Sequence, residues 1–339
     1  LELQYFDFSA WQHRWLDGEV FSGQLDYWLQ ELQGAPERLR LPTDRVRPPV
    51  QTANGDRVTF TWSQERLVQI EHLGHTAGAT LFMTLMSIWQ LLLSRYSKMD
   101  DICVGVPTAG RNRVETESMV GLFLNAIVIR GDLAGNPTFN RLLGQVREKS
   151  LNAFANQDIP ADRVVEALGI ERSAAYSPVA QVGFNLINSD REEGQWLQLP
   201  GVEVTPLKMA RDLSRYDLTL TFLRTKQYLR ATLEYNTDLF DRATIERMAD
   251  QFEYLVSEVI SSPDSHLDQF AIQSEESLLK TLNLSPADYL AVWPLTPFQR
   301  DFYLAHQTQP DSVCFALGGM IDIHGELDVE VWREALQWV

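Results

Sequence analysis

The sequence is poor in cysteine, and this shortage excludes two ways of stabilising a small fold. It has two cysteines, Cys103 and Cys314, which lie far apart and belong to no CxxC or Cys/His pattern. Neither a disulfide framework nor a zinc site is therefore predicted. A reducing compartment suits such a chain, and we expect a cytoplasmic location.

Cations are also scarce, and long apolar runs are missing. Lys and Arg number 29 against 46 Asp and Glu, which gives a formal net charge of -17 without any local Lys/Arg cluster. Such a chain repels a phosphate backbone, so nucleic-acid binding is not expected. The longest apolar run, residues 79–93, contains Thr, Ser and Gln and is too short to span a bilayer. It predicts a buried helix and no membrane partner.

The remaining composition is that of an ordered globular protein. With 339 residues, 45% hydrophobic and 22% charged, the chain can bury a sizeable core and is expected to hold about two domains. Apolar periodicity predicts helices and strands in alternation, which indicates a mixed α/β fold. The predicted helices cover residues 24–33, 63–76, 79–96, 138–157, 161–168 and 243–261; the predicted strands cover residues 57–62, 102–106, 125–130, 180–187, 217–223 and 229–235, the last two forming a hairpin.

Three stretches predict connections between these elements. Residues 36–50 contain four prolines among polar residues and predict an extended, solvent-facing connection between two helical regions. Residues 190–194 predict an exposed loop. Residues 261–292 are rich in Ser, Pro, Asp and Glu, which suits an interdomain linker. We therefore divide the chain into a domain at 1–270, a linker at 271–292 and the start of a second domain at 293–339.

Motifs of self-contained chemistry are missing from the sequence. It has no GxSxG nucleophile elbow, no Walker loop and no GxGxxG ahead of a helix. Glu71, His72 and His75 share one predicted helical turn but lack the HExxH spacing, so a solvated helix end is expected and no metal site is predicted. Residues 105–113 are either a strand-end turn or a loop beside a substrate. In the strand at 125–130, Asn125 must find hydrogen-bond partners or line a polar cavity.

A resemblance decides between these alternatives. Residues 5–12 (YFDFSAWQ), 120–130 (VGLFLNAIVIR), 156–160 (NQDIP) and 177–184 (SPVAQVGF) are similar to the motifs YxDFAxWQ, IGxFVNTxxxR, HQDxPFE and SPLFQVMF. These motifs occur in this order in the condensation domains of nonribosomal peptide synthetases. Asn156 stands where the third motif has His, and Ala161 and Asp162 stand in place of its Phe-Glu. The resemblance covers residues 5–270 and is specific because many segments match in order.

The resemblance implies a fold and an activity. The fold would be one chloramphenicol-acetyltransferase-like lobe, the C-terminal half of a two-lobed domain. In this family two carrier proteins deliver acyl and aminoacyl groups as phosphopantetheine thioesters, and the acceptor amine attacks the donor thioester to form an amide. The implied partners are donor and acceptor carrier-protein domains and neighbouring synthetase domains, and no cofactor is expected to bind this chain directly.

The catalytic motif of the family, HHxxxDG, does not occur in the sequence. Because the chain starts with Leu1 and ends in a helical pattern at 328–339, we expect a segment of a longer polypeptide that is inactive by itself and carries no catalytic residue. The residues carried over as candidates for the substrate tunnel are Asp7, Arg111, Asn125 and Ser177.

A second resemblance follows the linker. Residues 292–306 (VWPLTPFQRDFYLAH) and 321–332 (IDIHGELDVEVW) are similar to the opening of another condensation-type domain. A carrier-protein GGxS motif and an adenylation signature are both missing between the two. Three alternatives to condensation remain open: an epimerization domain of the same superfamily, a non-catalytic docking platform and, more distantly, a CoA-dependent acetyltransferase.

Overall fold

The structure is a computed structural model that describes residues 3–16, 18–189 and 212–274. The chain divides into two compact units, Leu1–Ser277 and Leu278–Val339. All described residues belong to the first unit. The loop predicted at 190–194, most of the linker and the second domain predicted at 293–339 lie outside the described residues, and the domain boundaries stay predictions.

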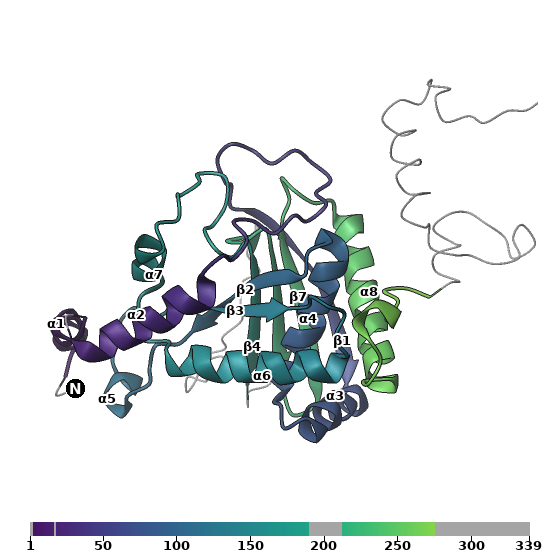
Figure 1. The fold of residues 1–339 in the computed structure, drawn as a ribbon, viewed down its shortest axis with the longest axis horizontal. Coiled ribbons are helices and arrows are strands. Elements are labelled where there is room, and N and C mark those ends of the chain that lie inside the picture. Colours follow the sequence, from purple (N-terminus) through teal and green to yellow (C-terminus); the bar gives the residue numbers. More distant parts are fainter. Residues whose placement is uncertain (1–2, 17, 190–211, 275–339) are drawn as a thin grey trace, which may run out of the picture. The chain divides into compact units, whose positions relative to one another are not determined.

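A seven-stranded mixed sheet forms the centre of the first unit (Figure 1). The strand order is β3-β2-β4-β6-β7-β1-β5, in which β2, β4 and β6 run parallel and the other neighbours pair antiparallel. The strands are β1 (Asn54–Ser63), β2 (Asp101–Thr108), β3 (Asn125–Asp132), β4 (Val182–Asn188), β5 (Asp212–Leu213), β6 (Leu218–Arg224) and β7 (Tyr228–Asn236). The predicted mixed α/β fold is confirmed, and so is the hairpin of β6 and β7.

Eight α-helices accompany the sheet in the described part of the chain. They are α1 (Tyr5–Trp15), α2 (Glu19–Leu32), α3 (Gln64–Thr76), α4 (Leu81–Ser97), α5 (Val114–Glu117), α6 (Phe139–Ala155), α7 (Ala161–Ala167) and α8 (Arg242–Ser261), with a short 3-10 helix at Leu267–Gln269. All six predicted helices are present, with ends that differ from the predicted ones by a few residues. The sequence did not reveal α1, because its run of Phe, Tyr and Trp has low helix propensity and none of its residues is buried.

The buried helix predicted from the apolar run at 79–93 is α4. It contacts β2, α3, α6 and α8, and its Leu85, Ile88 and Trp89 are fully buried. A helix that is apolar on nearly every side needs cover on every side. This arrangement places the main core between α4 and one face of the sheet.

The β3–β2 edge of the sheet is covered on both faces. A Cβ added to Gly131 of β3 would lie 2.3 Å from Gln90 of α4, whereas the neighbouring Arg130 donates hydrogen bonds to the carbonyl oxygens of Glu31 (2.8 Å) and Gln33 (2.9 Å) at the end of α2. Successive strand residues point to opposite faces. Helices α2 and α4 therefore lie on opposite faces of this edge, and α7 packs against α2 and β3.

The connection at 36–50 is extended and mostly exposed, as predicted, but it differs from the prediction in where it leads. It leads from α2 to a strand rather than joining two helical regions, and it is anchored to the core at two points. Leu39 is buried, and its backbone N–H donates to Oε1 of Gln181 at 2.8 Å. Farther along, Arg47 pairs with the buried Asp217. Tertiary contacts that the local sequence does not show therefore fix two points of a connection that otherwise faces solvent.

No single helix in the described ranges is long and apolar enough to cross a membrane. The bent pair of α3 and α4 passes the same test together, by length and composition only.

Candidate functional site

Two cavities meet at the beginning of β3. We call the first, of about 430 Å³, the aromatic groove, because Phe8, Trp11 and Trp15 of α1 line it together with Phe123. We call the second, of about 170 Å³, the Tyr216 cavity. Consecutive residues alternate between them: Asn125, Asp158 and Pro160 line the aromatic groove, and Ala126, Ile159 and Ala161 line the Tyr216 cavity. The start of β3 and residues 157–161 therefore form a common wall.

Asn125 holds this wall together. Its Nδ2 donates to the carbonyl oxygens of Gln157 (2.8 Å) and Ile159 (2.6 Å), and its Oδ1 accepts from the N–H of Ala161 (3.2 Å). Three of the four hydrogen bonds that an amide side chain can make are thus used within the protein. The expectation that Asn125 must find partners or line a polar cavity is met in both ways, while its contact with substrate stays a prediction.

Arg111 is engaged in shaping the loop before β3. Its guanidinium donates to the carbonyl oxygens of Thr116 and Met119, the latter at 3.0 Å, and its Cζ lies 4.2 Å from the ring centroid of Phe123. Such a cation–π contact and two carbonyl partners fix the side chain in place. Arg111 therefore supports the Phe123 wall of the aromatic groove, and a role beside the acceptor stays a prediction.

Asp7 lies at the exposed first turn of α1. Its Oδ2 accepts the N–H of Gln4 at 2.9 Å, which is half of a capping box. Asp7 does not line either cavity. The structure therefore shows a capping role for this residue, and its placement in a substrate tunnel remains untested.

Ser177 lines the Tyr216 cavity beside a strained turn. In this turn the N–H of Ala180 donates to the carbonyl oxygen of Pro178 at 2.7 Å, and Val179 between them has a φ of 64°. An i to i+2 hydrogen bond around a residue with positive φ is a γ-turn, which is rare and costly for a β-branched side chain. The surrounding contacts must hold it in this conformation.

Gln181 supplies these contacts. Its buried side chain donates from Nε2 to the carbonyl oxygens of Ser177 (2.8 Å) and Glu37 (3.3 Å), and its Oε1 accepts from Leu39. One side chain thus ties the Ser177 turn to the connection after α2. A Gln directly before the apolar strand β4 signals such a role, because a buried amide needs partners.

The aromatic groove owes its shape to contacts between α1 and the loop before β3. Phe8 lies 4.7 Å from Phe123 between ring centroids, and the Tyr5 hydroxyl donates to the carbonyl oxygen of Leu122 at 2.8 Å. A Cβ on Gly121 would lie 2.2 Å from the Tyr5 ring, so only glycine permits this approach. Arg113 stacks over Trp11 at 4.4 Å. The groove can therefore hold apolar or aromatic groups.

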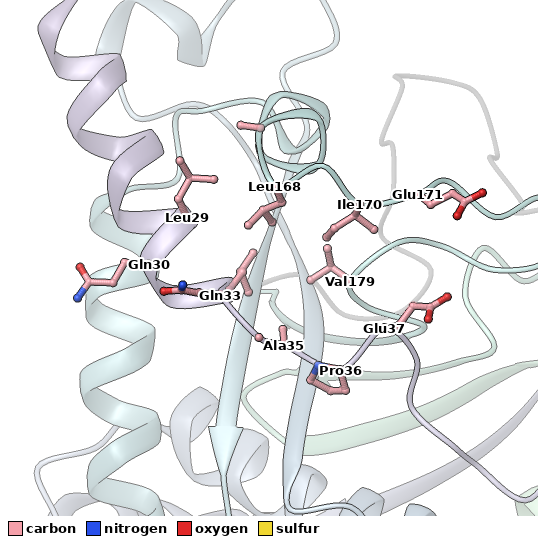
Figure 2. A pocket seen from close by; sticks show the side chains of 13 residues that line it. Leu29, Gln30, Gln33, Ala35, Pro36, Glu37, Leu168, Ile170, Glu171 and Val179 are labelled. Carbon is pink, nitrogen blue, oxygen red and sulfur yellow. The ribbon is translucent and has the colours of Figure 1, made fainter.

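A third and larger cavity, of about 690 Å³, lies between the ends of α2 and α7 (Figure 2). Leu29, Leu168, Ile170 and Val179 form its apolar interior, and the carboxylates of Glu37 and Glu171 extend from one side. Val179 also lines the Tyr216 cavity. The strained turn is therefore a partition between the two.

The sequence predicted no individual site role for four residues around this region: Arg47, Gln181, Tyr216 and Asp217. Asp217 is buried and forms two hydrogen bonds with Arg47, one of them 2.8 Å long. The two residues are 170 positions apart, so no local pattern connects them. Burial raises the pKa of the Tyr216 hydroxyl, and burial likewise raises the pKa of the Cys103 thiol in β2 to about 12.

None of the four described histidines, His13, His72, His75 and His266, lines these three cavities. In the described part of the chain there is also no cluster of three or more His, Cys, Asp and Glu residues that could hold a metal ion. The Tyr216 cavity offers a ligand apolar walls and two hydroxyl groups, those of Ser177 and Tyr216.

Comparisons with known proteins identify relatives of this chain. Among curated proteins, a linear gramicidin synthase of Brevibacillus parabrevis is 40% identical over 97% of the chain, and malpinin synthetase of Mortierella alpina is 39% identical over 99%. The chain spans only 6% and 4% of the lengths of these two relatives.

Solved structures share the fold. The X-domain in the complex with OxyB from teicoplanin biosynthesis aligns with a TM-score of 0.74 at 24% identity, over 80% of this chain and 61% of that one. A four-domain nonribosomal peptide synthetase, AB3403, aligns with a TM-score of 0.66 at 25% identity, over 75% of this chain and 20% of that one. The chloramphenicol-acetyltransferase-like lobe expected from the sequence is confirmed. Residues 1–279 match the family model for the condensation domain, and the chain therefore belongs to the condensation domain family.

Proposed function

We propose that this chain is the C-terminal part of a condensation domain in a nonribosomal peptide synthetase, acting in the cytoplasm. The observation that carries the proposal is the family match over residues 1–279, in a sequence that lacks HHxxxDG. Relatives named as a synthase and a synthetase, and the likeness to a solved four-domain nonribosomal peptide synthetase, support it. In this proposal HHxxxDG lies upstream of Leu1, and residues 293–339 begin a second condensation-type domain.

The reaction joins two groups tethered as phosphopantetheine thioesters to carrier-protein domains. The amine nitrogen of the acceptor attacks the thioester carbonyl of the donor, a C–N bond forms, the C–S bond breaks, and the donor thiol leaves while the amine loses a proton. Tethering makes the encounter effectively unimolecular, so positioning supplies much of the rate. This lobe contributes the cavities that position the groups, and the second His of HHxxxDG lies near the attacking amine.

The experiment that tests the proposal extends the chain upstream. The completed domain is combined with loaded donor and acceptor carrier proteins, and amide formation is followed by mass spectrometry, with the second His of HHxxxDG replaced by Ala as control. Amide that forms with the intact motif and disappears in the control supports the proposal. An intact motif without amide, over a panel of substrates, counts against it.

Two other functions have different signatures in the same experiment. An epimerization domain would invert the α-carbon of a single tethered aminoacyl group, which chiral analysis of the released amino acid detects. A docking platform would have a degraded HHxxxDG in the upstream sequence and no activity. Residues 123–125 and 156–158 favour condensation over epimerization because they fit the condensation motifs better than the epimerization pattern.

A further inference from the structure

The Tyr216 cavity has the size and lining of a pocket for an apolar group. It lies on the face of the sheet that α2 and α7 cover, and most of its wall is buried hydrocarbon from four elements. The wall residues include Trp28, Val128, Ile159, Val164 and Val165. A ligand group that entered it would exchange water for apolar contacts.

Two glycines make the floor of this cavity possible. A Cβ on Gly105 of β2 would lie 3.1 Å from the Tyr216 hydroxyl, and a Cβ on Gly183 of β4 would lie 3.1 Å from Cδ2 of the same ring. The Tyr216 ring therefore lies across two adjacent strands, at positions where an added Cβ would displace it by a few tenths of an ångström. In this way Gly105 and Gly183 set the depth of the pocket.

The cavity matches a group about the size of a benzene ring. Its volume is about 170 Å³, and an apolar protein cavity of about 150 Å³ is known to bind benzene. An isobutyl or phenyl group fits this space, whereas an indole with its second ring requires more. The Tyr216 and Ser177 hydroxyls have no hydrogen-bond partner among the described residues, so they are free to meet polar atoms of a ligand at the rim.

We propose that the Tyr216 cavity holds the side chain of one of the aminoacyl groups presented as thioesters, and that it selects side chains from the size of valine to the size of phenylalanine. This inference rests on the proposed function, because that function supplies the tethered aminoacyl thioesters. The chemistry is the same whether the donor or the acceptor delivers the side chain. The cavity is thus a specificity pocket, and Tyr216 at its floor and Val165 at its wall limit the size of the side chain that it binds.

Binding to the 339-residue chain tests the pocket without requiring catalysis. The probes are N-acetylcysteamine thioesters of alanine, leucine, phenylalanine and tryptophan, and the readout is the methyl NMR signals of Val128, Val164 and Val165. Leucyl and phenylalanyl thioesters are expected to shift these signals and to bind about 10-fold more tightly than the alanyl thioester. Tryptophanyl thioester is expected to leave the signals unchanged.

Two variants with matched controls test the stated limits. Val165→Ala widens the wall and is expected to admit the tryptophanyl thioester, whereas Val256→Ala, which removes the same carbons from the buried face of α8, is not. Gly105→Ala pushes the Tyr216 ring into the cavity and is expected to weaken leucyl binding about 10-fold. Its control is Gly144→Ala in α6, where an added Cβ meets nothing within 4 Å.

The outcomes separate this inference from the proposed function. If none of the four thioesters at millimolar concentration shifts the three methyl signals, or if Val165→Ala and Val256→Ala behave alike, the cavity is not a side-chain pocket. In the completed domain, varying the amino-acid side chain on one carrier protein at a time shows whether the pocket binds the donor or the acceptor group. Selective binding without amide formation would overturn the proposed function alone, and amide formation with selectivity unchanged by Val165→Ala would overturn the pocket alone.

Discussion

Removal of Arg47 is expected to destabilise the first unit strongly, because it leaves a carboxylate buried without a partner. The Asp217 side chain is only 2% exposed and receives both of its hydrogen bonds from Arg47, whose own side chain is 15% exposed. Breaking a buried ion pair by removing one member costs about 3–5 kcal/mol. Arg47 also donates to the carbonyl oxygen of Ala175 at 3.3 Å, so the loop that carries Ser177 loses a support.

The assay is urea unfolding of Arg47→Ala, Asp217→Asn and the double variant at pH 7. With a urea slope of about 3 kcal/mol per M, the midpoint of Arg47→Ala is expected to fall by about 1–1.7 M. The double variant is expected to be more stable than Arg47→Ala, because it no longer buries an unpaired charge. A double variant that is more stable than Arg47→Ala identifies the unpaired buried charge, rather than lost packing, as the cause of the destabilisation.

The control is the Arg45–Asp241 pair, whose side chains are 47% and 56% exposed. Exposed pairs contribute about 0–1 kcal/mol, so Arg45→Ala is expected to change the midpoint little. The reasoning is refuted if Arg47→Ala and Arg45→Ala unfold at similar urea concentrations, or if Asp217→Asn adds its full cost on top of Arg47→Ala.

Three further predictions concern single side chains. Asn125→Ala is expected to cost about 2–3 kcal/mol and to speed hydrogen exchange of the Ala161 N–H, because residues 157–161 lose their clasp. Gly110→Ala is expected to cost about 3 kcal/mol in urea unfolding, because Gly110 has a φ of 64° and its added Cβ would lie 1.8 Å from the carbonyl oxygen of Phe123. Cys103 is expected to resist alkylation at pH 8 until the protein unfolds, because burial raises the pKa of its thiol to about 12. In the unfolded chain the thiol has a pKa of about 8.5 and loses its proton at a lower pH than in the folded protein. The free energy of unfolding therefore falls as the pH rises from about 9 towards 12, and Cys103→Ala is expected to make this fall smaller.

Matched variants give these three predictions their controls. Asn156→Ala removes one exposed hydrogen bond at a helix end and is expected to cost less than about 0.5 kcal/mol. Equal effects of the two Asn variants would contradict the role of Asn125 in holding residues 157–161. Gly135 has a φ of 72°, and a Cβ added to it meets nothing within 4 Å. Gly135→Ala therefore measures backbone strain alone, which is expected to cost about 1 kcal/mol. Rapid labelling of Cys103 in the folded protein, located by peptide mapping, would show that its site opens readily.

The elements of this fold could be predicted from the sequence because their signals are local. The apolar run of α4, the alternation along β6 and β7 and the turn between those strands each act within one segment. The helix α1 was missed, because its aromatic residues are stabilised by packing against Phe123, more than a hundred positions away. Local propensity does not contain that contact.

The residues of the candidate site divide in the same way. The sequence alone determined which segments matter, since Asn125 and Ser177 lie in matching motifs and both line cavities. Only the tertiary structure decided what each does: Asn125 clasps a backbone segment, Arg111 holds a loop, and Asp7 caps a helix. It alone revealed the Arg47–Asp217 pair and the placing of Tyr216 over two glycines, because both depend on chain segments that meet only when the sheet has formed.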